Sequence, residues 1–289
     1  MTNIKLFEQQ RATLFAIAYR MVGSVSDAED LVQETFLRWQ QTQLEMIRSP
    51  KAYLVTIITR LCIDHLRRAR IQREHYIGCW LPEPFITHST DNPLDIIELA
   101  DSLSIAFLVL LEHLSPNERA IFLLREVFGY DYSAISNIVG KSPANCRQIM
   151  RRVRQRLAHS TPQTYHRGQE IKVEQFLDAW TTGNLEQLIA LMTNDIIYVS
   201  DGGGKASATH KPLHGQQKVA RFLITIRRSP KLQHIPNFTS RLGAINAQPS
   251  IINYANGVPH SVMMFDWSQA ERIQQIFTIV NPDKLQHIR

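Results

Sequence analysis

The sequence lacks the features of a secreted, membrane or disulfide-bonded protein. It has no apolar run of about 18 residues and no charged-then-apolar N-terminal segment, so it predicts neither a transmembrane helix nor a signal peptide. Cysteine is scarce: Cys62, Cys79 and Cys146 stand alone, without a C-x-x-C pair. Scattered cysteines are typical of free thiols in a reducing compartment. We therefore expect a cytoplasmic protein with no metal, cofactor or membrane partner.

Length and charge indicate several domains and a polyanionic partner. The 289 residues suffice for two or three domains, and the formal net charge is +6. The isoelectric point is near 9.3. A basic protein of this kind most often binds nucleic acid, provided that its charges cluster on one surface.

The first half of the chain is predicted to be helical on both sides of a linker. Apolar residues recur at three- and four-residue spacing over 5–70 and again from about Ile96 to Leu157. Pro82 and Pro84 exclude regular helix between these segments, so 71–100 is predicted to be a linker. Ser115-Pro116-Asn117-Glu118 predicts a helix start with a capping box.

The second half predicts a separate α+β domain. A polar segment, 159–168, contains Pro162 and Gly168 and is predicted to be a second linker. Helical patterns are followed from about residue 233 by strand-like segments, with a turn at Asn256-Gly257. This order favours helices packed on a curled antiparallel sheet. The expected helices are 170–182, 184–193 and 215–228.

Residues 131–158 have the pattern of a helix-turn-helix. Gly140 supplies a tight turn, and Ser142 and Pro143 begin a second helix. Arginine can bind guanine, and asparagine or glutamine adenine, in the major groove. An ordinary helix with a solvated basic face is the alternative. The candidate DNA-binding residues are Ser142, Asn145, Arg147, Gln148, Arg151 and Arg152.

Two further surfaces are predicted on the N-terminal helices. Basic residues follow an aromatic residue on the helix that begins near Pro50, a combination suited to melted DNA, although a solvated basic helix would look the same. An acidic helix face upstream suits docking to a basic protein, or simply favours the helix dipole. The candidates are Tyr53, Arg60, Arg67, Arg68 and Arg70 for DNA, and Asp27, Asp30, Gln33 and Glu34 for the protein partner.

These segments resemble the conserved regions of bacterial RNA polymerase sigma factors of the extracytoplasmic-function (ECF) type. Residues 27–36, Asp-Ala-Glu-Asp-Leu-Val-Gln-Glu-Thr-Phe, resemble region 2.2. Residues 49–54, Ser-Pro-Lys-Ala-Tyr-Leu, with the arginines to Arg70, resemble regions 2.3 and 2.4, and 131–158 resembles region 4.2. The resemblance implies docking on the β′ clamp helices and the β flap of the polymerase core. It also implies reading of the −10 and −35 promoter elements.

Three short motifs resemble those of one subgroup, the SigJ-like, ECF41-type factors. The subgroup carries a C-terminal SnoaL-like domain of the NTF2 superfamily, which is implied to regulate the sigma factor in cis. The motifs are Trp80-Leu81-Pro82-Glu83-Pro84, Asp201-Gly202-Gly203-Gly204-Lys205 and Asn281-Pro282-Asp283-Lys284-Leu285. Because three glycines permit close approach of another segment and Pro82 and Pro84 stiffen the linker, we expect the first two motifs to touch.

The resulting expectation is two all-α sigma domains followed by an α+β NTF2-like cone. The predicted divisions are a sigma2 domain over 1–72, a linker over 73–100, a sigma4 helix-turn-helix domain over 101–160 and a SnoaL-like domain over 166–289.

Two other function classes stay open at this point. NTF2-like enzymes place an Asp or His in an apolar pocket, and candidates here are Asp178, Asp201, His210, His214 and Asp266. No spacing among them demands catalysis, so a non-enzyme is expected, with an unidentified small ligand as an alternative use of the pocket. A helix-turn-helix repressor is the third class, but a repressor has no need of an acidic polymerase dock.

Overall fold

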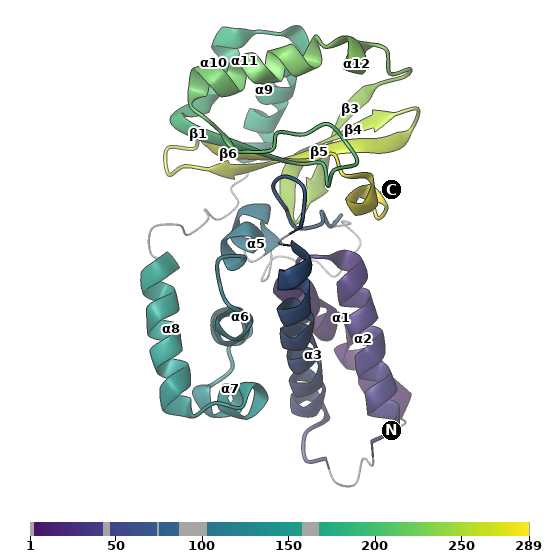
Figure 1. Cartoon of the computed structure of the whole chain (residues 1–289), viewed down its shortest axis with the longest axis vertical. Helices are drawn as coiled ribbons and strands as arrows, with labels where there is room; N and C mark the ends of the chain where they lie inside the picture. Colours follow the sequence, from purple (N-terminus) through teal and green to yellow (C-terminus); the bar gives the residue numbers. More distant parts are fainter. Residues whose placement is uncertain (1–2, 43–46, 74, 87–102, 158–167, 289) are drawn as a thin grey trace. The chain divides into compact units, whose positions relative to one another are not determined.

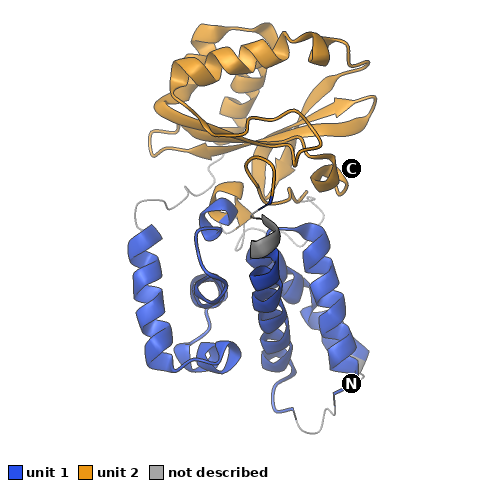
Figure 2. Ribbon diagram, in the orientation of Figure 1, with its two compact units in different colours: residues 1–75, 108–161 blue, residues 76–107, 162–289 orange. Residues whose placement is uncertain are grey.

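The computed structural model describes residues 3–42, 47–73, 75–86, 103–157 and 168–288 (Figure 1). The chain divides into two compact units (Figure 2). The helical unit comprises 1–75 and 108–161, and the α+β unit comprises 76–107 and 162–289. The predicted linker is therefore divided at residue 75, and its described segment 76–86 packs with the α+β unit.

Three long helices begin the helical unit: α1 (Asn3–Val22), α2 (Val25–Gln40) and α3 (Pro50–Arg73). Gly23 ends α1 at a φ of 71°, and the Ser24 side chain accepts a hydrogen bond from the Asp27 amide at the start of α2. The helices enclose Trp39 and the aliphatic side chains that recur along α1 and α3, which confirms the helical expectation.

The rest of the helical unit consists of shorter helices: α5 (Ile105–Leu111, which crosses the boundary between the units), α6 (Pro116–Phe122), η3 (Leu123–Val127), α7 (Tyr132–Val139) and α8 (Pro143–Leu157). The predicted capping box is confirmed, because Ser115 and Glu118 each bond the other's backbone amide. The continuous periodicity after Ile96 did not predict η3, a π-helix, or the turn at Gly129 (φ 69°) that follows it.

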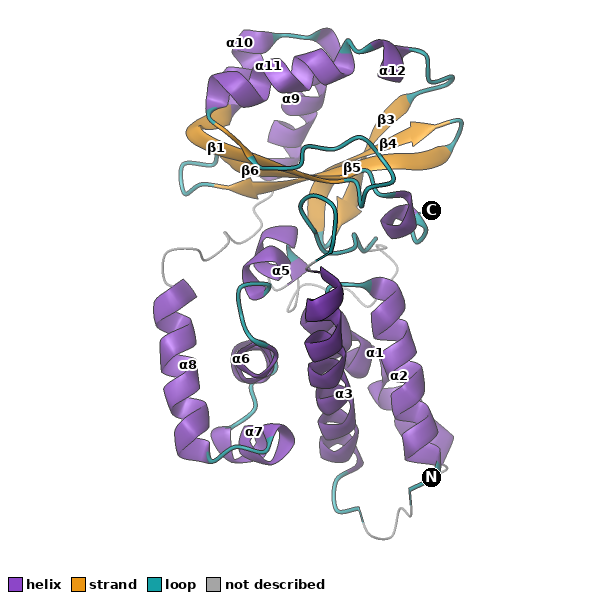
Figure 3. Cartoon of the chain, in the orientation of Figure 1, coloured by secondary structure: helices purple, strands orange, loops and turns teal. Residues whose placement is uncertain are grey.

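The α+β unit packs helices on one face of a six-stranded sheet (Figure 3). Phe176, Trp180, Phe265 and Trp267 are buried in the core between the layers. The helices are α9 (Gly168–Thr182), α10 (Leu185–Leu191), α11 (Gln216–Arg227) and α12 (Pro230–Gln233), with the 3₁₀ turn η4 (Pro282–Leu285) near the end. The strands are β1 (Met192–Asp201), β2 (Leu213–His214), β3 (Thr239–Ile245), β4 (Gln248–Ala255), β5 (Val258–Trp267) and β6 (Ile273–Ile279).

The sheet corrects one expectation. Its order is β2-β1-β6-β5-β4-β3, and β1 pairs with β6 in parallel, so the sheet is mixed rather than wholly antiparallel. Strands β3 to β6 follow one another as antiparallel neighbours, whereas β1 reaches β6 through a long connection that contains α11. The predicted turn is confirmed: Asn256 and Gly257, with φ of 50° and 77°, join β4 to β5. None of the described helices is long and apolar enough to cross a membrane.

Candidate functional site

The helix-turn-helix segment forms as the sequence predicts. Asp131 caps α7, Gly140 ends it at a φ of 67°, and Ser142 accepts a hydrogen bond from the Asn145 amide at 3.2 Å. Cys146, Met150, Val153 and Leu157 are buried on the inner face of α8.

The six DNA-binding candidates on this segment are all exposed. They differ from two neighbouring arginines, because Arg154 pairs with Glu126 at 2.6 Å and Arg156 with Glu118 at 3.2 Å. Arg147 lies over the Tyr132 ring at 5.8 Å. Within the described part of the chain, Arg151 and Arg152 form no ion pair. The charge available to an anionic ligand is therefore concentrated on the first three turns of α8.

The basic residues of α3 have different partners within the helical unit. Arg60 donates from Nε to the Ile138 carbonyl at 2.9 Å and from Nη2 to the Asn137 carbonyl at 2.8 Å. It therefore caps the C-terminal end of α7, where carbonyl groups lack helical partners. Arg67 pairs with Asp64 at 3.1 Å on an exposed face.

The remaining candidates of this cluster make other contacts. Arg68 donates to the Asp64 carbonyl at 3.3 Å. Tyr53 is partly exposed and packs against buried Trp39, with ring centroids 6.1 Å apart. The Arg70 side chain lies outside the described part of the structure.

The acidic candidates share α2. Asp30 and Gln33 are exposed, Glu34 pairs with Arg38 at 2.9 Å, and Asp27 lies 3.5 Å from His65. Leu37 is 47% exposed and follows Asp30 and Glu34 at helical spacing. Sequence reasoning missed Leu37, since only its exposure distinguishes it from a core leucine. The face thus combines carboxylates with one apolar side chain.

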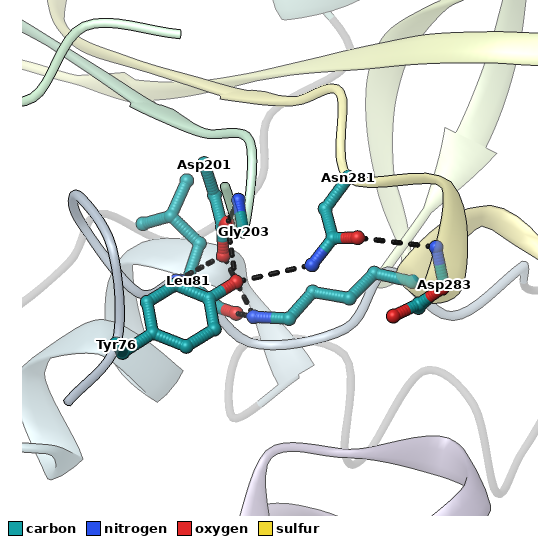
Figure 4. Close-up of polar contacts among 7 residues, drawn as sticks. Tyr76, Leu81, Asp201, Gly203, Asn281 and Asp283 are labelled. Atoms are coloured by element: carbon teal, nitrogen blue, oxygen red, sulfur yellow. Dashed lines mark hydrogen bonds and ion pairs between the residues drawn. The ribbon is translucent and has the colours of Figure 1, made fainter. Parts of the chain in front are cut away.

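The three short motifs meet in the α+β unit at a cluster that we call the linker clasp, formed by Tyr76, Leu81, Asp201, Gly203, Asn281 and Lys284 (Figure 4). Asp201 lies at its centre and is fully buried at the end of β1. Asp201 Oδ1 accepts hydrogen bonds from the Tyr76 hydroxyl at 2.6 Å and the Gly203 amide at 3.0 Å. Oδ2 accepts from the Leu81 amide at 2.8 Å and from Lys284 Nζ at 2.7 Å.

Lys284 connects the third motif to the linker. Besides pairing with Asp201, its ammonium donates to the Leu81 carbonyl and lies 4.3 Å from the centre of the Trp80 ring. Asn281 donates to the Tyr76 hydroxyl at 3.1 Å, and its own side chain accepts from the Asp283 amide. Burial raises the pKa of Tyr76, and the hydrogen bond to Asp201 raises it further, so this phenol stays a donor.

The glycines of the second motif permit this approach. A Cβ on Gly203, whose φ is 57°, would lie 2.2 Å from Asn281 Nδ2. A Cβ on Gly202 would lie 2.3 Å from the Ala206 carbonyl oxygen. Lys205 at the loop end pairs with Asp283 at 2.5 Å, and both side chains are about half exposed. A larger residue at 203 would therefore push the loop away from Asn281 and Tyr76, and one at 202 would distort the loop itself.

The rest of the linker motif is also held within the α+β unit. Leu81, Pro82, Glu83 and Pro84 are buried, and Glu83 lies 3.5 Å from His287. Trp80, the largest side chain of the motif, is only partly buried, whereas Leu81 is 1% exposed. Further along, backbone and side-chain bonds between Phe85 and Asn246 attach the segment to the end of β3. Tyr76 belongs to none of the three motifs, and sequence reasoning missed it.

The enzyme candidates lie outside the pocket that the described part of the α+β unit contains. A pocket of about 540 Å³ opens between α11, α12 and the sheet, and none of Asp178, Asp201, His210, His214 and Asp266 lines it. Burial raises the pKa of Asp266, which accepts a hydrogen bond from Gln274 at 2.7 Å. Among the described residues no three His, Cys, Asp or Glu side chains are grouped as a metal site.

Comparison with known proteins agrees with this arrangement. Family models for Sigma-70 region 2 and for Sigma-70, region 4 match residues 6–71 and 104–157. The ECF RNA polymerase sigma factor SigJ of Mycobacterium tuberculosis is 33% identical over 98% of this chain and 93% of its own length. A probable ECF sigma factor of the same species, SigI, is 29% identical over 96% of this chain and 93% of its own.

A solved structure extends the similarity to the fold. The crystal structure of M. tuberculosis SigJ matches 98% of both chains with a TM-score of 0.77 at 29% sequence identity. The chain therefore belongs to the ECF RNA polymerase sigma factors, the class that initiates transcription with the polymerase core on promoter DNA. Because the SigJ match extends through the α+β unit, the SigJ-like assignment is confirmed for the whole length of the described chain.

Proposed function

We propose that this sigma factor directs the polymerase core to promoters through three surfaces of its helical unit. The exposed polar face of α8 reads the −35 element, and α3 with Tyr53 opens and reads the −10 element. The acidic face of α2 docks on the β′ clamp helices, and the region 4 helices contact the β flap. The observation that carries the proposal is the separation of charge between α2, which presents carboxylates, and α8, which presents unpaired arginines.

The exposed arginines and amides of α8 are suited to different contacts with DNA. Arg147, Arg151 and the amides Asn145 and Gln148 are exposed, so they can reach base edges in a major groove. Arg154 pairs with Glu126, but both side chains are well exposed, so it can exchange this pairing for a phosphate at little cost. Base specificity then comes from the N-terminal part of α8, as in other recognition helices.

On α2 the docking surface is centred on Asp30 and Glu34, with Leu37 beside them. Two carboxylates attract a basic coiled coil, and an exposed leucine adds apolar contact at the centre of the interface. Glu34 exchanges its pairing with Arg38 for a partner residue at little cost, because the side chains of both are about half exposed.

The linker clasp supplies regulation in cis. By holding 76–86 against the α+β unit, it fixes part of the connection between regions 2 and 4, whose separation must match the spacing of two promoter elements. Clasped and released linkers are then two states with different activities. No step of this proposal is catalytic.

Run-off transcription with purified core polymerase on a cognate promoter tests the polymerase-docking part. Charge reversal of both Asp30 and Glu34 to Arg should lower core affinity by one to three orders of magnitude, because like charges then face each other across a desolvated interface. Glu8→Arg, a reversal of one charge at an exposed position of α1, is the control and should leave core affinity and transcription unchanged.

Core affinity is best measured directly, by fluorescence anisotropy of the labelled sigma factor. If the double reversal bound core as tightly as Glu8→Arg does, the docking assignment on α2 would be lost. If the double reversal bound core weakly but still supported transcription at saturating sigma concentration, the docking assignment would be retained. The defect would then lie in assembly of the holoenzyme and not in a later step.

A further inference from the structure

The pocket of about 540 Å³ in the α+β unit has no place in the function proposed above. Its volume is that of sites for small organic molecules, and its walls are mostly apolar. Trp180, Phe222 and Met263 line it from α9, α11 and β5. The segment 206–209, which directly follows the glycine motif, lines it too.

The polar groups on the sheet side of this pocket are neutral and come from adjacent strands. Ser200 and Thr278 are register partners on β1 and β6, so both hydroxyls lie on the same face of the sheet. Asn253 and Ser261 add an amide and a hydroxyl that bond each other at 2.8 Å. Burial lowers the pKa of His260, so its imidazole is neutral near pH 7.

Thr278 carries the clearest sign of a missing partner. Its side chain is 6% exposed and lines the pocket, and within the described residues its hydroxyl oxygen has no hydrogen bond of good geometry, although the Tyr198 hydroxyl lies close enough to interact with it. An unpaired buried hydroxyl is costly to a fold, and such groups are rare unless a ligand or water completes them. A ligand with one hydroxyl or carbonyl oxygen at the floor of the pocket would supply the partner.

Charge restricts the ligand further. No Asp or Glu lines the pocket, and Lys231, the one lysine in its wall, is exposed on α12. A charged group at the pocket floor would therefore be buried without a counter-ion.

We propose that this pocket binds a neutral, mainly apolar small molecule through a hydroxyl or carbonyl oxygen at Thr278, and that its occupancy is coupled to the linker clasp. The second part rests on the proposed regulatory function. The pocket and the clasp share the ends of two strands. On β1, Ser200 faces the pocket and the next residue, Asp201, holds the linker, while after β6 Val280 lines the pocket and Asn281 bonds Tyr76.

The glycine loop provides a second connection. Ser200 Oγ lies 2.8 Å from both the amide and the hydroxyl oxygen of Thr209, so the pocket wall is fixed to β1 immediately beside Asp201. A ligand that displaces 206–209 therefore moves the loop that contains Gly203. By thermodynamic linkage, whatever releases the clasp must also change ligand affinity.

Nile red, a neutral aromatic dye with a carbonyl group, is the probe for the binding site. Titrated into the full-length protein, it should give saturable, one-to-one enhancement of its fluorescence. Ile226→Trp narrows the pocket from a partly buried position on α11 and should weaken binding at least tenfold. Ile171→Trp adds the same ring at an exposed position of α9 and should leave binding unchanged. Absent saturation, or equal affinities in the two variants, would overturn the site.

Thr278→Val keeps the test decisive if Ile226→Trp fails to fold. Valine has the same shape as threonine and lacks the hydroxyl, so dye affinity should fall three- to tenfold while circular dichroism is unchanged. Unchanged affinity would overturn the assignment of Thr278 as the polar anchor.

Asp201→Asn tests the coupling in the same titration. Release of the clasp should change dye affinity at least threefold, and an identical affinity would refute the coupling. Transcription by Asp201→Asn without dye reports on the clasp alone. The dye titrations can therefore refute the pocket while transcription by Asp201→Asn still supports the regulatory function. Conversely, unchanged transcription would refute the regulatory function without affecting the evidence for dye binding.

Discussion

Asp201→Asn should release the linker from the α+β unit. The carboxylate is fully buried, accepts four hydrogen bonds and forms an ion pair with Lys284, which is itself 13% exposed in its side chain. The amide retains one acceptor oxygen but removes the buried carboxylate that Lys284 pairs with. Removing one partner of a buried pair costs about 3–5 kcal/mol.

A cost of about 3 kcal/mol would raise the population of released linker roughly 100-fold. Hydrogen exchange measures this release directly, because the Leu81 amide donates to Asp201 and is protected only while the clasp is closed. Exchange at 76–86 should therefore accelerate by about two orders of magnitude. Run-off transcription on one promoter should change in parallel.

Asp283→Asn is the matched control. It belongs to the same group of motifs, yet its pair with Lys205 is about half exposed, and surface pairs contribute about 0–1 kcal/mol. Its exchange and transcription should stay near those of the original chain. Unaccelerated exchange in Asp201→Asn would refute the clasp, and accelerated exchange with unchanged transcription would refute its regulatory role.

Three further outcomes are expected. Arg151→Ala should weaken binding to the −35 element by about 1–3 kcal/mol and relax specificity at one base pair. Arg156→Ala, which removes the ion pair with Glu118, should leave both affinity and specificity unchanged. Gel shifts with substituted promoters measure the two variants side by side. Asp266→Asn should stabilise the α+β unit at pH 7. Burial raises the pKa of Asp266, so the ionised carboxylate destabilises the folded state at neutral pH, whereas the protonated form does not. The difference in stability between the variant and the original chain should therefore disappear in acid, which thermal melts across pH would measure. Arg60→Ala should accelerate hydrogen exchange in α7 by removing two hydrogen bonds worth about 1 kcal/mol each, and unchanged exchange would contradict its role as a cap.

Local signals predicted most of the elements. The capping box at Ser115, the turn at Asn256-Gly257 and the glycine that ends α7 are each decided by a few adjacent residues. The parallel pairing of β1 with β6 was not predictable in this way, because alternation along a strand shows which residues face the core and not the direction of its neighbour.

The linker clasp shows the same limit at the level of a site. The motifs indicated that the linker and the glycine loop meet, but not that Asp201 would be the buried centre or that Tyr76 would be its donor. Tyr76 lies outside every motif and is separated by 125 positions from the carboxylate it bonds. Only the tertiary structure brings such pairs together.

Arg60 shows how one residue can take part in two states of a sigma factor. In the helical unit it bonds the last carbonyls of α7, so α3 and the helix-turn-helix pack together. A guanidinium that binds two carbonyls is also suited to a phosphate, which is the stronger acceptor because it is charged. On promoter DNA, regions 2 and 4 must contact separate elements, and this contact must then break. We infer that DNA phosphate competes with α7 for Arg60, so that the energy of binding DNA offsets the cost of separating the two helical regions.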